Sequence, residues 1–244
     1  MAGMYAAYHG PHGLRQISLK IHGLAFLLSE ELNKLGYHQT NKLFFDTVKI
    51  TLPLGVSQKA VETIALQNGM NFRVIHDGTI GISLDETTTH GDIKNILNVL
   101  AEAVGVKCTE VAFPEKLCEA EPSWPAILLR KSPVLKAPCF NRYHSETEMM
   151  RYLKKLENRD LALNRTMIPL GSCTMKLNAA AEMFSLSWPE FGNVHPFVPA
   201  DQAAGYYEMI HNLEKDLCEI TGFAAISLQP NSGASGEYTG LLVI

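Results

Sequence analysis

The most informative stretch of the chain is Ser227-Leu-Gln-Pro-Asn-Ser-Gly-Ala-Ser-Gly-Glu-Tyr-Thr-Gly-Leu-Leu-Val-Ile244. The apolar run 223–228 predicts a β-strand, which Pro230 ends because proline has no N–H to donate to a strand ladder. Residues 231–233 tolerate turn geometry, and an apolar helical pattern begins at Ala234. A strand, a turn of small residues and a helix start together expose several backbone N–H groups at the positive end of a helix dipole. Such a turn suits an anion, a phosphate in particular.

An ordinary strand-to-helix connection has the same local pattern, so this alternative stays open. The stretch is not a GxGxxG motif and lacks the lysine of a nucleotide P-loop. If the turn binds a phosphate, a molecule other than ATP or NAD fits better.

Both ends of the chain have a composition that is unusual for a domain boundary. Residues 240–244 have the pattern of a helix interior, without a cap or a polar turn. Leaving such side chains in water forfeits roughly 1.5–3 kcal/mol each. Residues 1–8 have the same unfinished composition. We therefore expect the chain to be an internal piece of a larger protein.

Composition excludes several classes of protein. A formal net charge of -4 argues against a nucleic-acid or membrane-surface partner. No apolar run approaches the roughly 20 residues of a membrane span, and no secretory signal is visible. The 5 cysteines are scattered and form no CxxC pair, while His9 and His12 lack a third ligand. We expect a globular protein with reduced thiols and no metal site.

Residues 1–105 predict a compact α/β unit. A breaker cluster at 9–13 precedes the first helix, and Asp77-Gly78 is a hairpin signal. Ser57 is a candidate N-cap, and Thr89 starts a capping-box-like pattern with Asp92. The expected elements are helices over 14–35, 57–68 and 89–104 and strands over 43–52, 72–76 and 79–84.

Residues 106–140 and 141–244 differ from this unit. Prolines interrupt any periodicity in 106–140, which predicts a linker that crosses a surface. In 141–244 we expect helices from Ser145, over 179–183 and over about 202–221, and an irregular aromatic segment over 188–199. The helix 202–221 has an apolar face that we expect to point inward: Tyr206, Ile210, Leu213, Leu217 and Ile220.

A second cluster of candidate functional residues lies in the loop 167–178. Ser172, Cys173 and Thr174 concentrate hydroxyl and thiol groups behind Pro169 and Gly171, and loops that display such groups often bind ligands. The alternative is a turn whose hydroxyls bond to their own backbone. His195 could hydrogen-bond or stack on a ligand, although packing in its aromatic loop explains it as well.

Several motifs resemble the P-protein of the glycine cleavage system, the pyridoxal-phosphate-dependent, decarboxylating glycine dehydrogenase. The resemblance extends over essentially the whole chain. Its motifs are Phe44-Phe-Asp46, Asp77-Gly-Thr-Ile-Gly-Ile-Ser-Leu-Asp-Glu86, Tyr143-His-Ser-Glu-Thr-Glu148, Met167-Ile-Pro-Leu-Gly-Ser-Cys-Thr-Met-Lys-Leu-Asn178, Asn193-Val-His-Pro-Phe197 and Leu228-Gln-Pro-Asn-Ser-Gly-Ala-Ser-Gly-Glu-Tyr238.

The resemblance implies an α/β fold of the fold-type-I class, in which two tandem halves follow each other. Residues 1–105 would be the C-terminal small α/β domain of the first half, and residues 106–140 the proline-rich linker. Residues 141–244 would be the N-terminal part of the second, catalytic half. The chain would thus combine the small domain of one half with the start of the large domain of the next.

The resemblance also implies a function. The family decarboxylates glycine with pyridoxal 5'-phosphate and passes the aminomethyl group to a lipoyl carrier protein. Four residues match positions that hold the cofactor phosphate: Ser232, Gly233, Ala234 and Ser235. The segment with Ser172, Cys173, Thr174 and His195 matches a lining of the glycine pocket.

Further expectations concern this chain itself. The family's Schiff-base lysine matches no residue here, Lys176 included, so we expect no catalytic residue, poor cofactor retention and no activity from this chain alone. The alternative is a non-catalytic docking fragment that binds the full-length enzyme or the carrier. A different fold-type-I enzyme, such as an aminotransferase, is a third reading. By family we expect a homodimer in the mitochondrial matrix, although this chain has no transit peptide.

Overall fold

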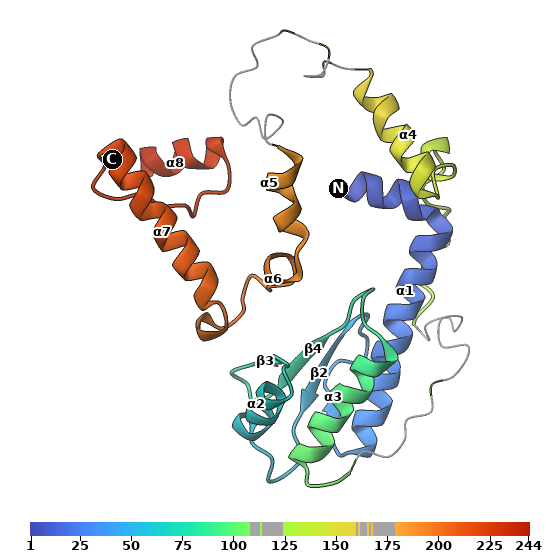
Figure 1. The fold of residues 1–244 in the computed structure, drawn as a ribbon. Coiled ribbons are helices and arrows are strands. Elements are labelled where there is room, and N and C mark those ends of the chain that lie inside the picture. Colours follow the sequence, from blue (N-terminus) through green and yellow to red (C-terminus); the bar gives the residue numbers. More distant parts are fainter. Residues whose placement is uncertain (108–112, 114–123, 160, 162–164, 166, 168–178) are drawn as a thin grey trace. The chain divides into compact units, whose positions relative to one another are not determined.

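A computed structural model of the chain describes residues 1–107, 113, 124–159, 161, 165, 167 and 179–244. The chain divides into two compact units, Met1–Leu156 and Glu157–Ile244. Among the described residues, every strand lies in the first unit, and the second unit contains helices and loops (Figure 1). The chain is therefore an α/β protein by its described elements.

The first unit is built on a four-stranded antiparallel sheet of order β1-β2-β4-β3. Val48 lies opposite Ile82, and Ile50 lies opposite Ile80, so all four side chains share one face. These side chains are buried, because the helices pack on this face. The strands are β1 (His38–Gln39), β2 (Thr47–Thr51), β3 (Arg73–Val74) and β4 (Ile80–Ser83).

Three helices supply the other half of this core: α1 (Ala2–Lys34), α2 (Gln58–Gln67) and α3 (His90–Ala103). Their buried side chains form one cluster with those of the strands. The helical members of the cluster are Leu24, Ala25, Leu28, Leu32, Val61, Ile93, Ile96, Leu97 and Leu100. The opposite face of the sheet is polar, and the Thr47 and Ser83 hydroxyls hydrogen-bond there at 2.9 Å.

The predicted starts of α2 and α3 are confirmed. The Ser57 hydroxyl accepts a hydrogen bond from the Ala60 N–H at 3.1 Å. Thr89 and Asp92 form a reciprocal capping box. The bonds from Thr89 lower the pKa of the Asp92 carboxyl, because they stabilise its charged form. The sequence could predict these caps because each cap satisfies N–H groups only a few residues away.

The predicted hairpin at Asp77-Gly78 is also confirmed. Gly78 has φ 87°, and the Asp77 carboxylate accepts from the N–H of Thr79 at 3.0 Å and from its hydroxyl. Lys49 binds the same carboxylate at 2.6 Å. The Lys49 bond, followed by the Thr79 bonds, lowers the pKa of Asp77 to about 2. The strands are shorter than predicted, because pairing covers only the residues that face a neighbouring strand.

A buried hydrogen bond joins Tyr37, next to β1, to α3. Its side chain is fully buried, and its hydroxyl donates to the carbonyl oxygen of Leu100 at 2.9 Å. This carbonyl belongs to the last turn of α3, where carbonyls lack an intrahelical N–H partner. Burial raises the pKa of Tyr37 to about 12.

The expected breaker cluster at 9–13 does not precede the first helix but lies inside it. Helix α1 already begins at Ala2, so the predicted start near Leu14 was wrong. Gly10 has φ 64° and ψ 179°, which splits α1 into two helical pieces at a kink. Pro11 follows and has no N–H for the preceding turn. The carbonyl of Tyr8, just before the kink, is bonded by His144 Nδ1 at 2.7 Å.

The described end of the expected linker, residues 124–141, follows the surface of the first unit. Its 3-10 turn Pro138–Phe140 contacts α1, and helix α4 (Glu146–Glu157) comes next, as predicted from Ser145. The Asn141 side-chain amide donates to the carbonyl oxygens of Leu135 at 2.8 Å and Ala137 at 3.1 Å. These bonds hold residues 135–141 in a closed turn beside the kink of α1.

The second unit consists of short helices and one long helix. Its helices are α5 (Ala180–Phe184), α6 (Pro189–Gly192), α7 (Ala204–Thr221) and α8 (Gly233–Val243). Gly222 ends α7 with φ 74°, as predicted for a left-handed C-terminal residue. The Tyr206 hydroxyl donates to the Phe191 carbonyl at 2.6 Å and so links α7 to α6.

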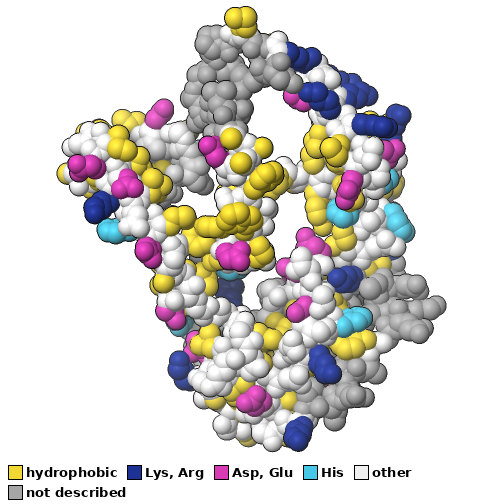
Figure 2. Space-filling view, in the orientation of Figure 1, with side chains coloured by type: hydrophobic (Ala, Val, Ile, Leu, Met, Phe, Trp, Pro, Cys, Tyr) yellow, Lys and Arg dark blue, Asp and Glu magenta, His cyan; other side chains and the backbone are white. Residues whose placement is uncertain are grey.

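Two predictions for this unit were wrong. Residues 223–228 form no strand, because a strand needs a paired neighbour and none lies within 179–244. The apolar face of α7 is not inward: Ile210, Leu213 and Ile220 are 37%, 46% and 79% exposed. No residue of 179–244 is buried, and apolar side chains are visible on its surface (Figure 2).

Candidate functional site

The turn before α8 has the geometry of a helix N-terminus, as the sequence predicted. Ser232 is the N-cap, with extended φ and ψ of −159° and 163°, and α8 runs from Gly233 to Val243. A serine suits this position because its side chain can accept from an N–H of the first turn. The predicted helix start at Ala234 is correct to within one residue.

A small hydrogen-bond network fixes this turn. The Ser232 Oγ accepts from the Ser235 N–H at 3.2 Å, and it donates to the Ser235 Oγ at 3.0 Å. The Ser235 hydroxyl in turn lies 3.4 Å from the Asn231 Oδ1 and donates to it. The backbone carbonyl of Ser232 accepts from Gly236 at 2.9 Å. Three hydroxyl and amide side chains thus surround the first turn of α8.

The donor set of this turn fits a phosphate group. Among the described residues, nothing accepts a hydrogen bond from the backbone N–H groups of Gly233 and Ala234. They lie at the positive end of the α8 dipole, next to the Ser232 and Ser235 hydroxyls. Phosphate oxygens accept from backbone N–H and hydroxyl donors of this kind. The turn is exposed, so an anion held by these groups alone would stay in contact with water.

His195 lies in a tight turn of its own. Its Nδ1 accepts from the Phe197 N–H at 3.0 Å, and its carbonyl accepts from the Val198 N–H at 3.0 Å. The accepting Nδ1 leaves Nε2 to carry the proton of the neutral ring, pointing away from this turn. The imidazole is exposed, and no hydrogen bond or ring contact joins it to the Ser232 turn in the described part of the chain. The structure does not bring these two predicted site residues together.

Ser172, Cys173 and Thr174, together with Lys176, lie outside the described residues. The prediction that the first three line a substrate pocket therefore stays a prediction. The described residues also lack two other features. They contain no group of three or more histidine, cysteine, aspartate or glutamate side chains that could hold a metal ion, and no helix with the length and apolar character to cross a membrane.

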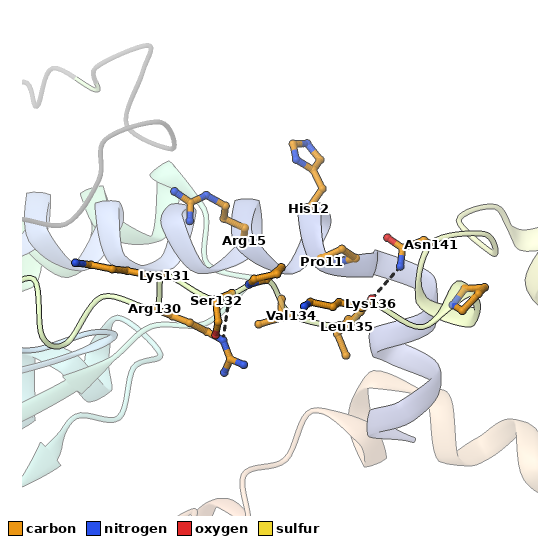
Figure 3. A pocket seen from close by; sticks show the side chains of 12 residues that line it. Pro11, His12, Arg15, Arg130, Lys131, Ser132, Val134, Leu135, Lys136 and Asn141 are labelled. Atoms are coloured by element: carbon orange, nitrogen blue, oxygen red, sulfur yellow. Dashed lines mark hydrogen bonds between the residues drawn. The ribbon is translucent and has the colours of Figure 1, made fainter.

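The first unit contains a basic hollow that we did not predict from the sequence. The hollow, about 820 Å³ in volume, lies between the kinked start of α1 and residues 130–141 (Figure 3). It is lined by Pro11, His12, Arg15, Arg130, Lys131, Ser132, Pro133, Val134, Leu135, Lys136, Pro138 and Asn141. The available signal was the pair Arg130-Lys131 with Lys136 close behind, within a segment that we interpreted as a linker.

Comparison with known proteins relates the chain to one family. Residues 1–100 match the family model described as glycine cleavage system P-protein. The whole chain is similar to glycine dehydrogenase (decarboxylating) of Paraburkholderia xenovorans (strain LB400), with 50% identity over 247 residues. The match covers 100% of this chain and 25% of the relative. The chain thus spans about a quarter of the length of this curated relative.

Proposed function

Because the chain belongs to the glycine cleavage system P-protein family, we propose that it is one segment of an enzyme that decarboxylates glycine. The 50% identity over the whole chain carries this proposal. The full-length enzyme would pass the aminomethyl group to the lipoyl carrier protein and act as a homodimer. A mitochondrial location is likewise a proposal that comes from the resemblance alone.

We propose pyridoxal 5'-phosphate as the cofactor of the full-length enzyme, with the turn before α8 as its phosphate site. When bound, the cofactor supplies an electron sink for the carbon that loses CO₂. The Gly233 and Ala234 N–H groups would donate to the phosphate, and the Ser232 and Ser235 hydroxyls would complete the contact. The local hydrogen bonds of the two serines hold both hydroxyls at the open end of the helix. Each hydroxyl would turn its single proton from its present acceptor, Ser235 Oγ or Asn231 Oδ1, to the phosphate.

The division of roles within the enzyme follows from the donor set. The turn can orient the phosphate, but none of the described side chains in its hydrogen-bond network carries an amine that could hold the other end of the cofactor. His195 would contribute an Nε2–H donor for a substrate carboxylate, because its Nδ1 is already bonded to Phe197. We therefore propose that this segment positions ligands and that the rest of the enzyme performs the proton and bond chemistry.

The phosphate site is tested in the full-length enzyme with the double variant Ser232→Ala and Ser235→Ala. Hydrogen bonds to charged groups contribute about 1.5–3 kcal/mol each, so we expect cofactor affinity to fall at least about tenfold. Cofactor content is read from its visible absorbance after dialysis, and glycine decarboxylation is measured with a lipoyl acceptor. Ser227→Ala is the matched control, because its hydroxyl bonds only locally to the Gln229 N–H.

Two results would count against the proposal. Unchanged cofactor retention in the double variant would remove the α8 turn from the phosphate site. Release of CO₂ from glycine by residues 1–244 alone would contradict the proposed dependence on the remainder of the enzyme. A docking role for this segment would instead show as binding to the full-length enzyme or to the carrier without any cofactor.

A further inference from the structure

The basic hollow lies beside the kink of α1. At Gly10 the helix changes direction, and residues 130–141 occupy the adjacent space. An added Cβ at Gly10 would lie 2.8 Å from the Phe140 carbonyl oxygen, so the two segments approach as closely as a glycine permits. Val134, Leu135 and Pro11 are half-buried in the lining. These three side chains form an apolar floor. The two walls of the hollow are residues 11–15 of α1 and residues 130–141, which lie far apart in the sequence.

The charge of the lining is opposite to that of the chain. Acidic residues outnumber lysine and arginine in the sequence, 25 to 21. The described residues of the lining nevertheless include Arg15, Arg130, Lys131 and Lys136, with His12 beside them, and none of these described residues is an aspartate or glutamate. The described residues offer no ion-pair partner to Arg130, Lys131 or Lys136. Arg130, Lys131 and Lys136 lie close together in one segment and create a local positive potential that attracts anions.

The spread of these groups decides the kind of anion. His12 and Arg15 project from α1, whereas Arg130 and Lys131 project from the facing segment in other directions (Figure 3). They do not converge on one point, as the donors of a single-phosphate site would. The Arg130 Nε is already bonded to the Ser132 carbonyl at 3.3 Å, which turns its guanidinium along the segment. An extended ligand that carries carboxylates at intervals can reach cations that are spread in this way, and it can also cover the apolar floor.

We propose that this hollow docks an acidic, extended segment of another protein. Its carboxylates would pair with Arg130, Lys131 and Lys136, and its apolar side chains would cover Val134 and Leu135. Such contacts act mainly through long-range attraction and charge complementarity, so binding would weaken with salt. The proposal is independent of glycine chemistry, because none of its residues belongs to the α8 turn.

The test uses the whole chain and a fluorescein-labelled oligoglutamate peptide, with anisotropy as the readout. We expect saturable binding that weakens several-fold between about 50 and about 200 mM NaCl. The variant Arg130→Glu with Lys131→Glu should weaken binding at least about tenfold, since it replaces attraction by repulsion on one wall. Arg130→Gln with Lys131→Gln should give a smaller loss. Circular dichroism checks that each variant is folded.

The control variant is Lys42→Glu with Lys94→Glu, two exposed lysines of the same unit that do not line the hollow. It changes the net charge equally and should alter the affinity less than about twofold. Equal weakening by the control would overturn the proposal, because net charge alone would then explain binding. So would binding of an oligoglutamine peptide with the same affinity, or tighter binding of inorganic triphosphate, which would indicate a small-anion site.

Discussion

Replacing Gly10 by alanine tests whether the kink of α1 and the packing of residues 130–144 depend on one missing side chain. Gly10 has φ 64° and ψ 179°, a conformation that only glycine adopts without cost. The added Cβ would lie 2.6 Å from His144 Cε1 and 2.8 Å from the Phe140 carbonyl oxygen. Backbone strain costs about 1–3 kcal/mol and overpacking about as much again, so we expect a loss of roughly 2–5 kcal/mol.

The least costly relief of this clash is release of residues 138–144 from α1, because a backbone carbonyl cannot rotate away as a side chain does. Hydrogen–deuterium exchange should therefore rise in 138–144 and around Tyr8, whose carbonyl loses the His144 bond. The matched control is Gly3→Ala, since an added Cβ at Gly3 meets no heavy atom within 4 Å. Unchanged exchange together with an unfolding free energy within about 0.5 kcal/mol of the parent would refute this reasoning.

Three further predictions concern the first unit. Tyr37→Phe should cost about 1–3 kcal/mol in urea unfolding, because the buried Leu100 carbonyl loses its donor; the pKa near 12 means that the ionisation-linked stability is present below pH 10 and is lost as pH rises through about 12. Asp77 has a lowered pKa of about 2, so its stabilising effect is present above its usual pKa of 3.8 and is lost as pH falls through about 2. Parent and Asp77→Asn should thus differ near neutral pH and converge in acid, whereas parallel pH profiles would show that the Lys49 contact is not stabilising. Thr89→Ala should lower thermal stability by about 1 kcal/mol, with Thr89→Ser restoring most of it.

The sequence predicted those parts of the fold that depend on short-range chemistry. The Ser57 cap, the Thr89 capping box and the Asp77-Gly78 turn each involve bonds over two or three residues, and each is confirmed. The errors involve partners that lie far away in the chain. His144 bonds the carbonyl of Tyr8 at the end of the first helical piece of α1. Residues 223–228 would form a strand only if another strand paired with them. Periodicity does not identify such partners.

In the candidate site, too, short-range features were predictable and long-range ones were not. The N-cap role of Ser232 was predictable, because it depends on the residues that follow at once. The local pattern suggested an anion such as a phosphate at that turn, and the family resemblance added the identity of the cofactor; both stay predictions. The basic hollow could not be predicted, because Arg15 and Arg130 are far apart in sequence and meet only through the kink.

The bond between Tyr8 and His144 spans 136 residues, and this separation has a consequence for synthesis on the ribosome. The first helical piece emerges early, but its end cannot be closed until residue 144 has left the exit tunnel. At about 5–20 residues per second, that interval is on the order of ten seconds. During this time the nascent helix end holds a carbonyl that only water can satisfy. We expect the amino-terminal segment to be among the last parts of the first unit to settle.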